Sequence, residues 1–157
     1  MFYTYYNAPI GILRLASDGH ALTELRFPNA FVVGETAPQW QASETPFVDT
    51  MKQLDAFFEG KLKQFKLPLK PSGTEFQKDV LDALQAIPYG ETRSYADIAS
   101  HVSRPKAVRA VGAANGRNPI AIIIPCHRVI GKNGSLTGFG GGLELKQWLL
   151  DLEAEYR

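Results

Sequence analysis

The first seventy residues contain short runs in which apolar and polar positions alternate, separated by turn signals. Three runs rich in aromatic and aliphatic residues predict strands: residues 2–6, 10–16 and 22–27. Apolar positions at helical spacing follow Thr45 and Pro46 and end at Gly60, which predicts a helix. Alternation over residues 65–69 predicts a further half-buried strand. We therefore expect residues 1–70 to form a small α/β scaffold domain, an antiparallel sheet plus a helix.

Beyond a linker at residues 70–73, the apolar positions recur at the spacing of helices. The pattern, its caps and its breakers predict four helices: residues 74–87, 95–102, 106–114 and 143–154. Pro105 is expected at the first position of the third helix, and Asn115 and Gly116 to stop it. The last helix is expected to bury one stripe: Leu145, Trp148, Leu149 and Leu152.

The second and third predicted helices are joined by a turn of about four residues, which is the pattern of a helix-turn-helix. A compact helical hairpin without a DNA-binding role is the alternative. The expected fold class is α/β: the N-terminal α/β domain is followed by a mainly helical C-terminal domain, residues 74–157, that contains the helix-turn-helix.

Alanine and valine occupy most positions of the third predicted helix. Ala107, Ala110 and Ala114 offer no hydrogen bonds to base edges in a major groove. They do allow close packing against a shallow groove, where the shape and deformability of DNA are read. Arg109 is a long cation amid these small residues. A sequence-specific DNA-binding regulator is therefore the weaker alternative.

Cys126 is the only cysteine in the chain, and it follows an apolar run between two prolines. The run, Ile120 to Ile124, is short and rich in β-branched residues, which predicts a buried strand. His127 and Arg128 come directly after the cysteine. Cationic neighbours and free backbone N–H groups stabilise a thiolate, so we expect the thiol pKa to be lowered. The alternative is a small buried hydrophobe, which is what a lone cysteine usually is.

The net charge of +1 argues for no particular partner, but the distribution of charge does. Seven Lys and Arg residues against a single acid, Asp97, lie between Arg93 and Lys132, whereas residues 1–73 contain seven of each sign. A basic surface around a reactive cysteine favours a polyanionic partner. A solvated basic face is the alternative.

Several classes of protein are not supported by the sequence. One cysteine excludes an intrachain disulfide and a Cys-rich zinc site, and three scattered histidines lack metal-ligand spacing, so no metal site is expected. The glycine-rich segment at 138–142 lacks the Gly-Lys-Ser/Thr spacing of a P-loop. No apolar run reaches the roughly 20 residues that cross a bilayer. We expect a cytoplasmic protein with no membrane association.

The segment Pro125 to Arg128 resembles the active-site motif of the O6-alkylguanine-DNA alkyltransferases, which are single-use DNA repair proteins. Further segments resemble the family pattern in the same order: Tyr89 and Gly90 with Ser94 and Tyr95, residues 104–112, Asn118 and Pro119, and residues 141–143 with 148–150. The resemblance covers residues 74–154 and extends more weakly over the first seventy.

The resemblance implies direct-reversal DNA repair. The protein is expected to bind, as a monomer, the minor groove of double-stranded DNA that carries O6-alkylguanine. It is expected to flip the damaged base out of the duplex and to transfer the alkyl group irreversibly to its own cysteine. This is a methylated-DNA–protein-cysteine methyltransferase reaction with a single turnover and no cofactor.

The resemblance also implies roles for particular residues. Cys126 is the alkyl acceptor, and Glu153, His127 and a water molecule deprotonate it. Tyr95 lies beside the flipped guanine and helps to donate to the leaving base, and Arg109 fills the gap in the duplex. The other implied positions are Ala107, Ala110 and Ala114 against DNA, Asn118 as the hinge to the active-site strand, and Val129, Phe139 and Gly140 around the base.

The chain departs from the family pattern at some positions. Phe139 stands where family members often carry tyrosine, so we expect that no hydroxyl is needed there. The zinc ligands that some members carry in the first domain are absent. A cysteine hydrolase that uses Cys126 and His127 is a further alternative, but in such enzymes the base is normally distant in sequence and adjacent side chains tend to diverge.

Overall fold

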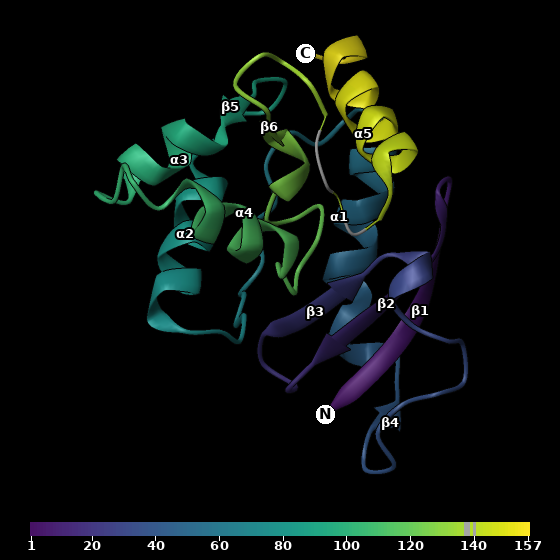
Figure 1. Ribbon diagram of the computed structural model, residues 1–157. Helices are drawn as coiled ribbons and strands as arrows, with labels where there is room; N and C mark the ends of the chain where they lie inside the picture. The colour runs from purple at the N-terminus through teal and green to yellow at the C-terminus, as the bar shows by residue number, and fades with distance from the viewer. Residues whose placement is uncertain (137–138, 140) are drawn as a thin grey trace.

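The computed structural model describes residues 1–157 except Thr137, Gly138 and Gly140. A sheet with one helix behind it lies beside a group of helices, and the last helix packs along the boundary between them (Figure 1). The expected contact of Gly140 with the base lies outside the described residues. No helix in the described part of the chain is both long and apolar enough to cross a membrane.

The N-terminal sheet has the strand order β3-β2-β1-β4. Its strands have these bounds: β1, Phe2–Ala8; β2, Gly11–Ser17; β3, Leu22–Arg26; β4, Gln41–Ala42. The first three strands form the expected antiparallel meander. The turn before β3 is fixed by Asp18, whose Oδ1 accepts backbone hydrogen bonds from His20 and Ala21, both 2.8 Å. The sheet is mixed rather than purely antiparallel, because β4 returns along the outer edge parallel to β1.

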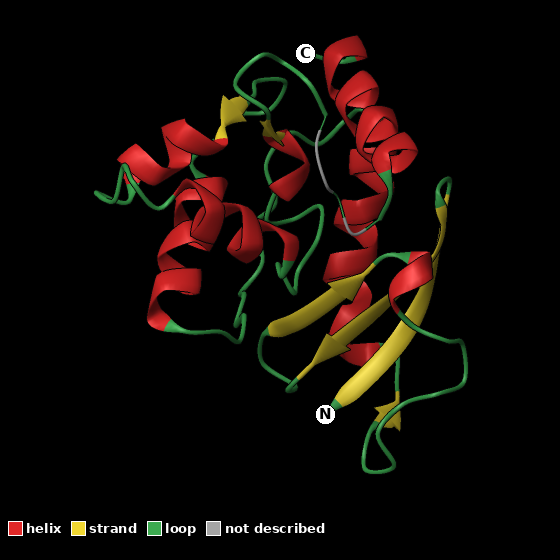
Figure 2. Ribbon diagram, in the orientation of Figure 1, coloured by secondary structure: helices red, strands yellow, loops and turns green. Residues whose placement is uncertain are grey.

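Helix α1 (Val48–Phe58) follows a 3-10 turn over Thr45–Phe47 and lies behind the sheet (Figure 2). The helix was predicted, and its buried face joins the apolar face of the sheet in the core. The strand expected over residues 65–69 is wrong. Only Leu69 forms a bridge, to Leu22, because Pro68 has no N–H with which to continue a ladder.

The C-terminal part contains the four predicted helices and one short sheet. The helices have these bounds: α2, Glu75–Gln85; α3, Tyr95–His101; α4, Val108–Gly116; α5, Leu143–Glu155. Capping boxes begin α2 at Thr74 and α3 at Ser94, as expected. Strand β5 (Arg93–Ser94) pairs in parallel with β6 (Val129–Ile130), which brings the start of α3 next to the Cys126 segment.

The bounds of α4 differ from the prediction at both ends. Pro105 lies in the preceding turn, and the helix begins only at Val108. The reason is a tight turn in which the Ala107 N–H donates to the Arg104 carbonyl, 2.9 Å, so helical geometry starts later. At the other end, Asn115 and Gly116 form the last turn of α4 instead of stopping it.

The buried strand expected over Ile120–Ile124 is also wrong, although all five residues are buried. Only Ile120 forms a bridge, to Leu25 of β3. Ile122 has a φ of +69°, a left-handed conformation that is strained for a β-branched residue. The chain curls because the Ile124 N–H donates to the Ile120 carbonyl, 3.0 Å, and the buried turn then leads into the 3-10 turn Cys126–Arg128.

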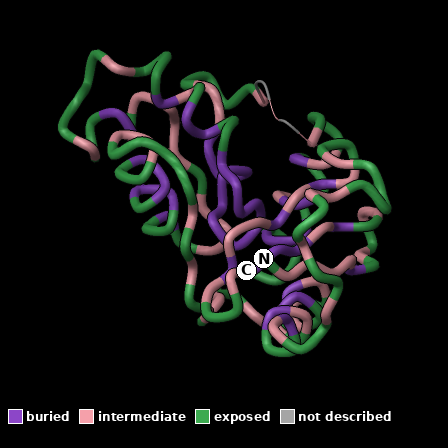
Figure 3. Tube along the Cα trace, turned by 90° about the horizontal axis from the view of Figure 1, so that it is seen from below, coloured by how far each residue is buried: buried purple, intermediate pink, exposed green. Residues whose placement is uncertain are grey.

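A single hydrophobic core joins the two parts of the molecule. In Figure 3 the buried segments gather in the interior, with exposed turns of helix and loop around them. Trp148 was expected in this core, but it is 37% exposed. Its ring instead packs on Phe58 of α1, with ring centroids 6.0 Å apart. Helix α5 is thereby fixed against the N-terminal part.

Candidate active site

Cys126 begins a buried 3-10 turn where the chain leaves the interior between the two parts of the molecule. Its side chain is 4% exposed and free of any disulfide. The Cys126 N–H donates to the Ile124 carbonyl, 2.8 Å, and the Cys126 carbonyl accepts from Asn115 Nδ2, 3.4 Å. Both backbone polar groups of Cys126 are therefore hydrogen-bonded, which fixes the position of the residue.

Asn118 determines the shape of the segment that leads to the cysteine. Its Nδ2 donates to the Ile124 carbonyl, 2.8 Å, and its Oδ1 accepts from the Ile120 N–H, 3.0 Å. One buried side chain thus joins the end of α4 to both ends of the curled segment. The hinge expected at Asn118 has a geometric basis, although the segment that it holds is a turn and not a strand.

Glu153 of α5 is the centre of a buried ion cluster directly behind the cysteine. His127 Nε2 lies 2.5 Å from Glu153 Oε2. Arg128 donates through Nε to Oε1, 2.8 Å, and through its second terminal nitrogen to Oε2, 3.1 Å. The backbone N–H of Gly90 also donates to Oε1, 3.1 Å. The sequence placed Glu153 at the edge of a stripe; the structure brings it into contact with both residues that follow the cysteine.

The protonation states in this cluster follow from burial and from the hydrogen bonds. Burial would raise the pKa of Glu153, but hydrogen bonds and charge from His127 and Arg128 outweigh it and hold the pKa at about 2. Burial lowers the pKa of His127 below its ordinary value, so the imidazole is neutral at pH 7. A neutral ring that donates through Nε2 to the carboxylate keeps a lone pair on Nδ1. Nδ1 of His127 is buried and has no hydrogen-bond partner among the described residues.

The expected lowering of the Cys126 pKa is contradicted by the structure. Burial raises the thiol pKa, opposed by a hydrogen bond from Asn118 and by the charge of Lys146. The prediction failed because Arg128 turns away from the sulfur toward Glu153, and because His127 carries no charge. The sequence reasoning missed Lys146 altogether, because charged residues are rarely fully buried.

A small cavity of about 80 Å³ opens beside Cys126. Its walls include Asn118 and Phe139, as expected, and also residues of the N-terminal part such as Phe27. The rings of Phe27 and Phe139 have their centroids 5.4 Å apart. The N-terminal part is therefore more than a scaffold, because it builds one wall of the cysteine pocket.

The remaining residues expected at the base lie close to this pocket. Val129 is fully buried in β6, and its N–H donates to the Cys126 carbonyl. Tyr95 is half-buried at the start of α3, and its ring passes the backbone of Gly112 in α4. The pairing of β5 with β6 places the start of α3, and with it Tyr95, next to the cysteine turn.

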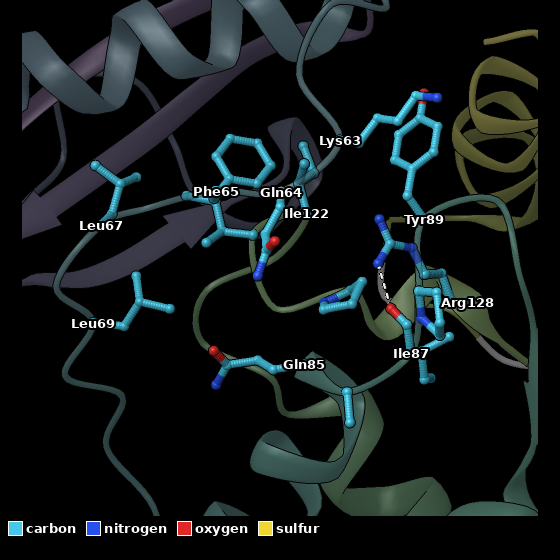
Figure 4. Close-up of a pocket in the computed structure, with 14 residues that line it drawn as sticks. Lys63, Gln64, Phe65, Leu67, Leu69, Gln85, Ile87, Tyr89, Ile122 and Arg128 are labelled. Carbon is cyan, nitrogen blue, oxygen red and sulfur yellow. Dashed lines mark hydrogen bonds between the residues drawn. The ribbon is translucent and has the colours of Figure 1, made fainter. Parts of the chain in front are cut away.

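A larger cavity of about 390 Å³ lies on the other side of Arg128, between the segment at 63–69 and the end of α2. Figure 4 shows the Arg128 guanidinium reaching toward Tyr89, with its hydrogen bond to the Ile87 carbonyl, 2.8 Å. The guanidinium carbon lies 5.6 Å from the centre of the Tyr89 ring. Arg128 is thus a wall between this cavity and the ion cluster, and it is not a surface cation.

The outer face of the helix-turn-helix carries part of the expected basic surface. Five of the seven predicted cations are exposed: Arg104, Lys106, Arg109, Arg117 and Lys132. Arg128 is buried, and Arg93 pairs with Glu91, 3.2 Å. On α4, Ala110 is exposed and Ala107 is half-buried, but Ala114 is 3% exposed. Ala114 faces the core, so its expected contact with DNA is wrong.

No group of three or more metal-ligating side chains is found within the described part of the chain. The negative charge of Glu153 is balanced by Arg128.

Family models match nearly the whole chain. The model described as "6-O-methylguanine DNA methyltransferase, DNA binding domain" matches residues 75–155, and that of the ribonuclease-like domain of the same protein matches residues 1–71. Together with the fold, they define the class: a DNA methyltransferase with an α/β part and a helical DNA-binding part. The chain belongs to the 6-O-methylguanine DNA methyltransferase family. Its activity is that of a methylated-DNA–protein-cysteine methyltransferase, which repairs O6-alkylguanine in DNA.

The sequence is similar to those of known proteins over nearly their full length. A methylated-DNA–protein-cysteine methyltransferase of Methanosarcina acetivorans is 51% identical over 153 residues, covering 98% of each chain. The Mycobacterium tuberculosis protein of the same name is 49% identical over 151 residues, covering 96% of this chain and 91% of that one. A crystal structure of Mycobacterium tuberculosis OGT in complex with DNA superposes with a TM-score of 0.91 at 48% identity, covering 99% and 94% of the two chains.

Proposed function

We propose that Cys126 is the residue that receives the alkyl group. The observation that carries this proposal is the position of its thiol: it lines a pocket shared by both parts of the chain, and the next residue in the same turn, His127, hydrogen-bonds to Glu153 of α5. The similarity to a protein crystallised with DNA supports a DNA duplex as the bound partner.

The proposed reaction begins with the proton of the Cys126 thiol. His127 accepts it at Nδ1 through a water molecule, while Glu153 holds the ring through Nε2 and stabilises the imidazolium that forms. The thiolate then attacks the alkyl carbon of O6-alkylguanine in line with the C–O bond. The C–S bond forms as the C–O bond breaks, and the electron pair stays on guanine. The Tyr95 hydroxyl hydrogen-bonds to the leaving base and helps to supply its proton.

The alkylated atom is not accessible inside a stacked duplex, so the nucleotide must rotate out, at a cost of a few kcal/mol. We infer that Arg109 occupies the vacated space, since it is the long exposed cation of α4. Ala107 and Ala110 allow the helix to approach the minor groove closely. The flipped base then enters the pocket beside Asn118, Val129 and Phe139.

The product of transfer is a thioether, which water does not readily cleave. One protein molecule therefore repairs one lesion and is consumed. We further propose that residues 1–70 and 74–157 act as two units with the pocket between them. We also propose that the protein acts as a monomer and that it works in the cytoplasm, where a free cysteine stays reduced.

The test uses a duplex with one radiolabelled O6-methylguanine. The intact protein should become labelled in proportion to its own amount, and Cys126→Ala should bind the same duplex without becoming labelled. Labelling of Cys126→Ala at the normal level would overturn the assignment of the acceptor.

A further inference from the structure

Lys146 is a buried cation for which the reaction proposed above has no use. It lies in the first turns of α5, and its side chain is 0% exposed. Its ammonium nitrogen lies 5.5 Å from the centre of the Phe139 ring and 6.0 Å from the centre of the Tyr95 ring. Of these two rings, that of Phe139 lines the cysteine pocket. Lys146 therefore lies against that pocket from the side of α5.

Burying an ammonium is costly unless something compensates for its charge. The two aromatic rings supply part of the compensation, because a ring face attracts a desolvated cation. Burial lowers the pKa of Lys146, and the charge of a Cys126 thiolate raises it again. In return, the charge of Lys146 acts to lower the pKa of Cys126. The charge interaction between the two residues is mutual.

The other basic side chains near the cysteine, Arg128 and His127, do not place a positive charge beside the sulfur. Arg128 donates to both oxygens of Glu153 and to the Ile87 carbonyl. His127 is kept neutral by burial and hydrogen-bonds to the same carboxylate. The titratable groups around Cys126 and Lys146 are thus Tyr95 from α3 and His127 from the cysteine's own turn. Behind them lies the Glu153 carboxylate, whose negative charge is balanced by Arg128. The positive charge that acts on the Cys126 sulfur is that of Lys146 on α5.

We propose that Lys146 is a positioning residue whose ammonium is the counter-charge of the Cys126 thiolate. It rests on Cys126 being the alkyl acceptor. When the proton leaves the thiol for His127, the buried pocket gains a negative sulfur, and Lys146 balances that charge. When the C–S bond forms, the sulfur becomes neutral and Lys146 keeps its proton. Lys146 therefore favours the reactive state of the cysteine without taking part in a bond.

The test measures the rate of iodoacetamide labelling of Cys126 against pH, which needs neither DNA nor repair. Lys146→Met keeps the length of the side chain and removes its charge. We expect the midpoint of its profile to rise by about one pH unit, a roughly tenfold lower labelling rate below the midpoint. Lys146→Arg, which keeps the charge, should shift it by less than half as much. Lys132→Met removes an exposed cation and should leave the profile unchanged.

The same midpoint in folded Lys146→Met as in the parent overturns the proposal. Circular dichroism reports whether each variant is folded. If Lys146→Met does not fold, the parent protein itself gives the answer through carbon-13 NMR of labelled lysines, with the Lys146 signal assigned from Lys146→Arg. Because the coupling is reciprocal, the Lys146 pKa must fall once Cys126 is methylated, and an unchanged pKa overturns the proposal.

The two proposals fail in different ways. If Cys126 were not the acceptor, the alkyl group would map to another residue while the iodoacetamide profiles still shifted. If Lys146 had no electrostatic role, the alkyl group would map to Cys126 and the profiles would coincide.

Discussion

Arg128 donates a hydrogen bond to each carboxylate oxygen of Glu153, 2.8 and 3.1 Å, and both side chains are buried. A guanidinium and a carboxylate that meet in this two-point geometry fix each other's orientation. Because His127 contacts the same carboxylate, the arginine fixes the direction of the imidazole as well. The two residues that follow Cys126 in its turn are thereby held by Glu153 of α5.

The first prediction concerns acid stability. The pKa of Glu153 is lowered from its ordinary 4.5 to about 2, so its ionised form stabilises the fold above pH 4.5, and this contribution is lost as the pH falls through 2. The shift corresponds to about 3 kcal/mol. In urea denaturation, the stability difference between the parent and Glu153→Gln should therefore be largest near pH 6 and shrink toward pH 2. A difference that does not depend on pH would show that the carboxylate is not held ionised.

The second prediction concerns His127 as the proton acceptor. Its lowered pKa keeps Nδ1 free at neutral pH, and protonation at lower pH removes the base. Removing a general base costs about 10²–10⁴-fold in rate. We expect His127→Gln to slow single-turnover repair by this range at pH 7, whereas His101→Gln, which changes an exposed histidine of α3, should have little effect. Equal rates in the two variants would remove His127 from the mechanism.

The third prediction concerns Asn118. Asn118→Ala leaves the buried Ile120 N–H without a partner, and the Ile124 carbonyl keeps only its hydrogen bond from the Cys126 N–H. A buried N–H left unpaired costs about 1–3 kcal/mol and one further lost hydrogen bond about 1 kcal/mol, so we expect a destabilisation of about 2–4 kcal/mol in chemical denaturation, together with slower repair. The matched control is Asn133→Ala, whose bonds to Ser135 are exposed and which should cost under about 1 kcal/mol. Similar costs for the two variants would argue against Asn118 as the organiser of the segment.

The fourth prediction separates insertion of Arg109 from simple attraction to phosphate. If Arg109 fills the space left by the flipped nucleotide, Arg109→Ala should slow repair of duplex DNA much more than alkyl transfer from free O6-alkylguanine, which needs no flipping. Arg109→Lys should recover only part of the loss, because a planar guanidinium stacks and an ammonium does not.

Lys106→Ala, which removes a neighbouring exposed cation, is the control. It should weaken DNA binding and lower the slope of log K against log salt concentration by about one. It should not slow repair of the bound duplex selectively. Equal losses for Arg109→Ala on the duplex and on the free base would mean that Arg109 supports the fold or the chemistry instead.

The helices were predictable because their caps and spacings are local. The capping boxes at Thr74 and Ser94 are formed by residues three positions apart, and no distant contact is needed to recognise them. The segment Ile120–Ile124 could not be predicted in the same way. Its burial followed from its composition, but its curled backbone depends on the side chain of Asn118, which occupies the hydrogen-bonding groups that a strand would use.

The acceptor cysteine was visible in the sequence, but its electrostatic surroundings were not. Arg128 lies two positions after Cys126 in the sequence, yet its guanidinium donates to Glu153 and not to the sulfur. Lys146 lies on the buried side of α5, three residues before Leu149 and seven before Glu153. This is helical spacing, but a charged residue is not expected at a buried position. Phe27 reaches the pocket only because the two parts of the chain pack together.

Intact-mass spectrometry is the most direct test of the central claim, that Cys126 accepts one alkyl group and is consumed. The protein is incubated with an excess of duplex that contains a single O6-methylguanine, and peptide mapping then locates the modification. We predict a mass increase equal to one methyl group replacing a hydrogen, located on Cys126, with one lesion repaired per protein molecule. Repair of many lesions by one molecule, or a methyl group on any other residue, would contradict the account.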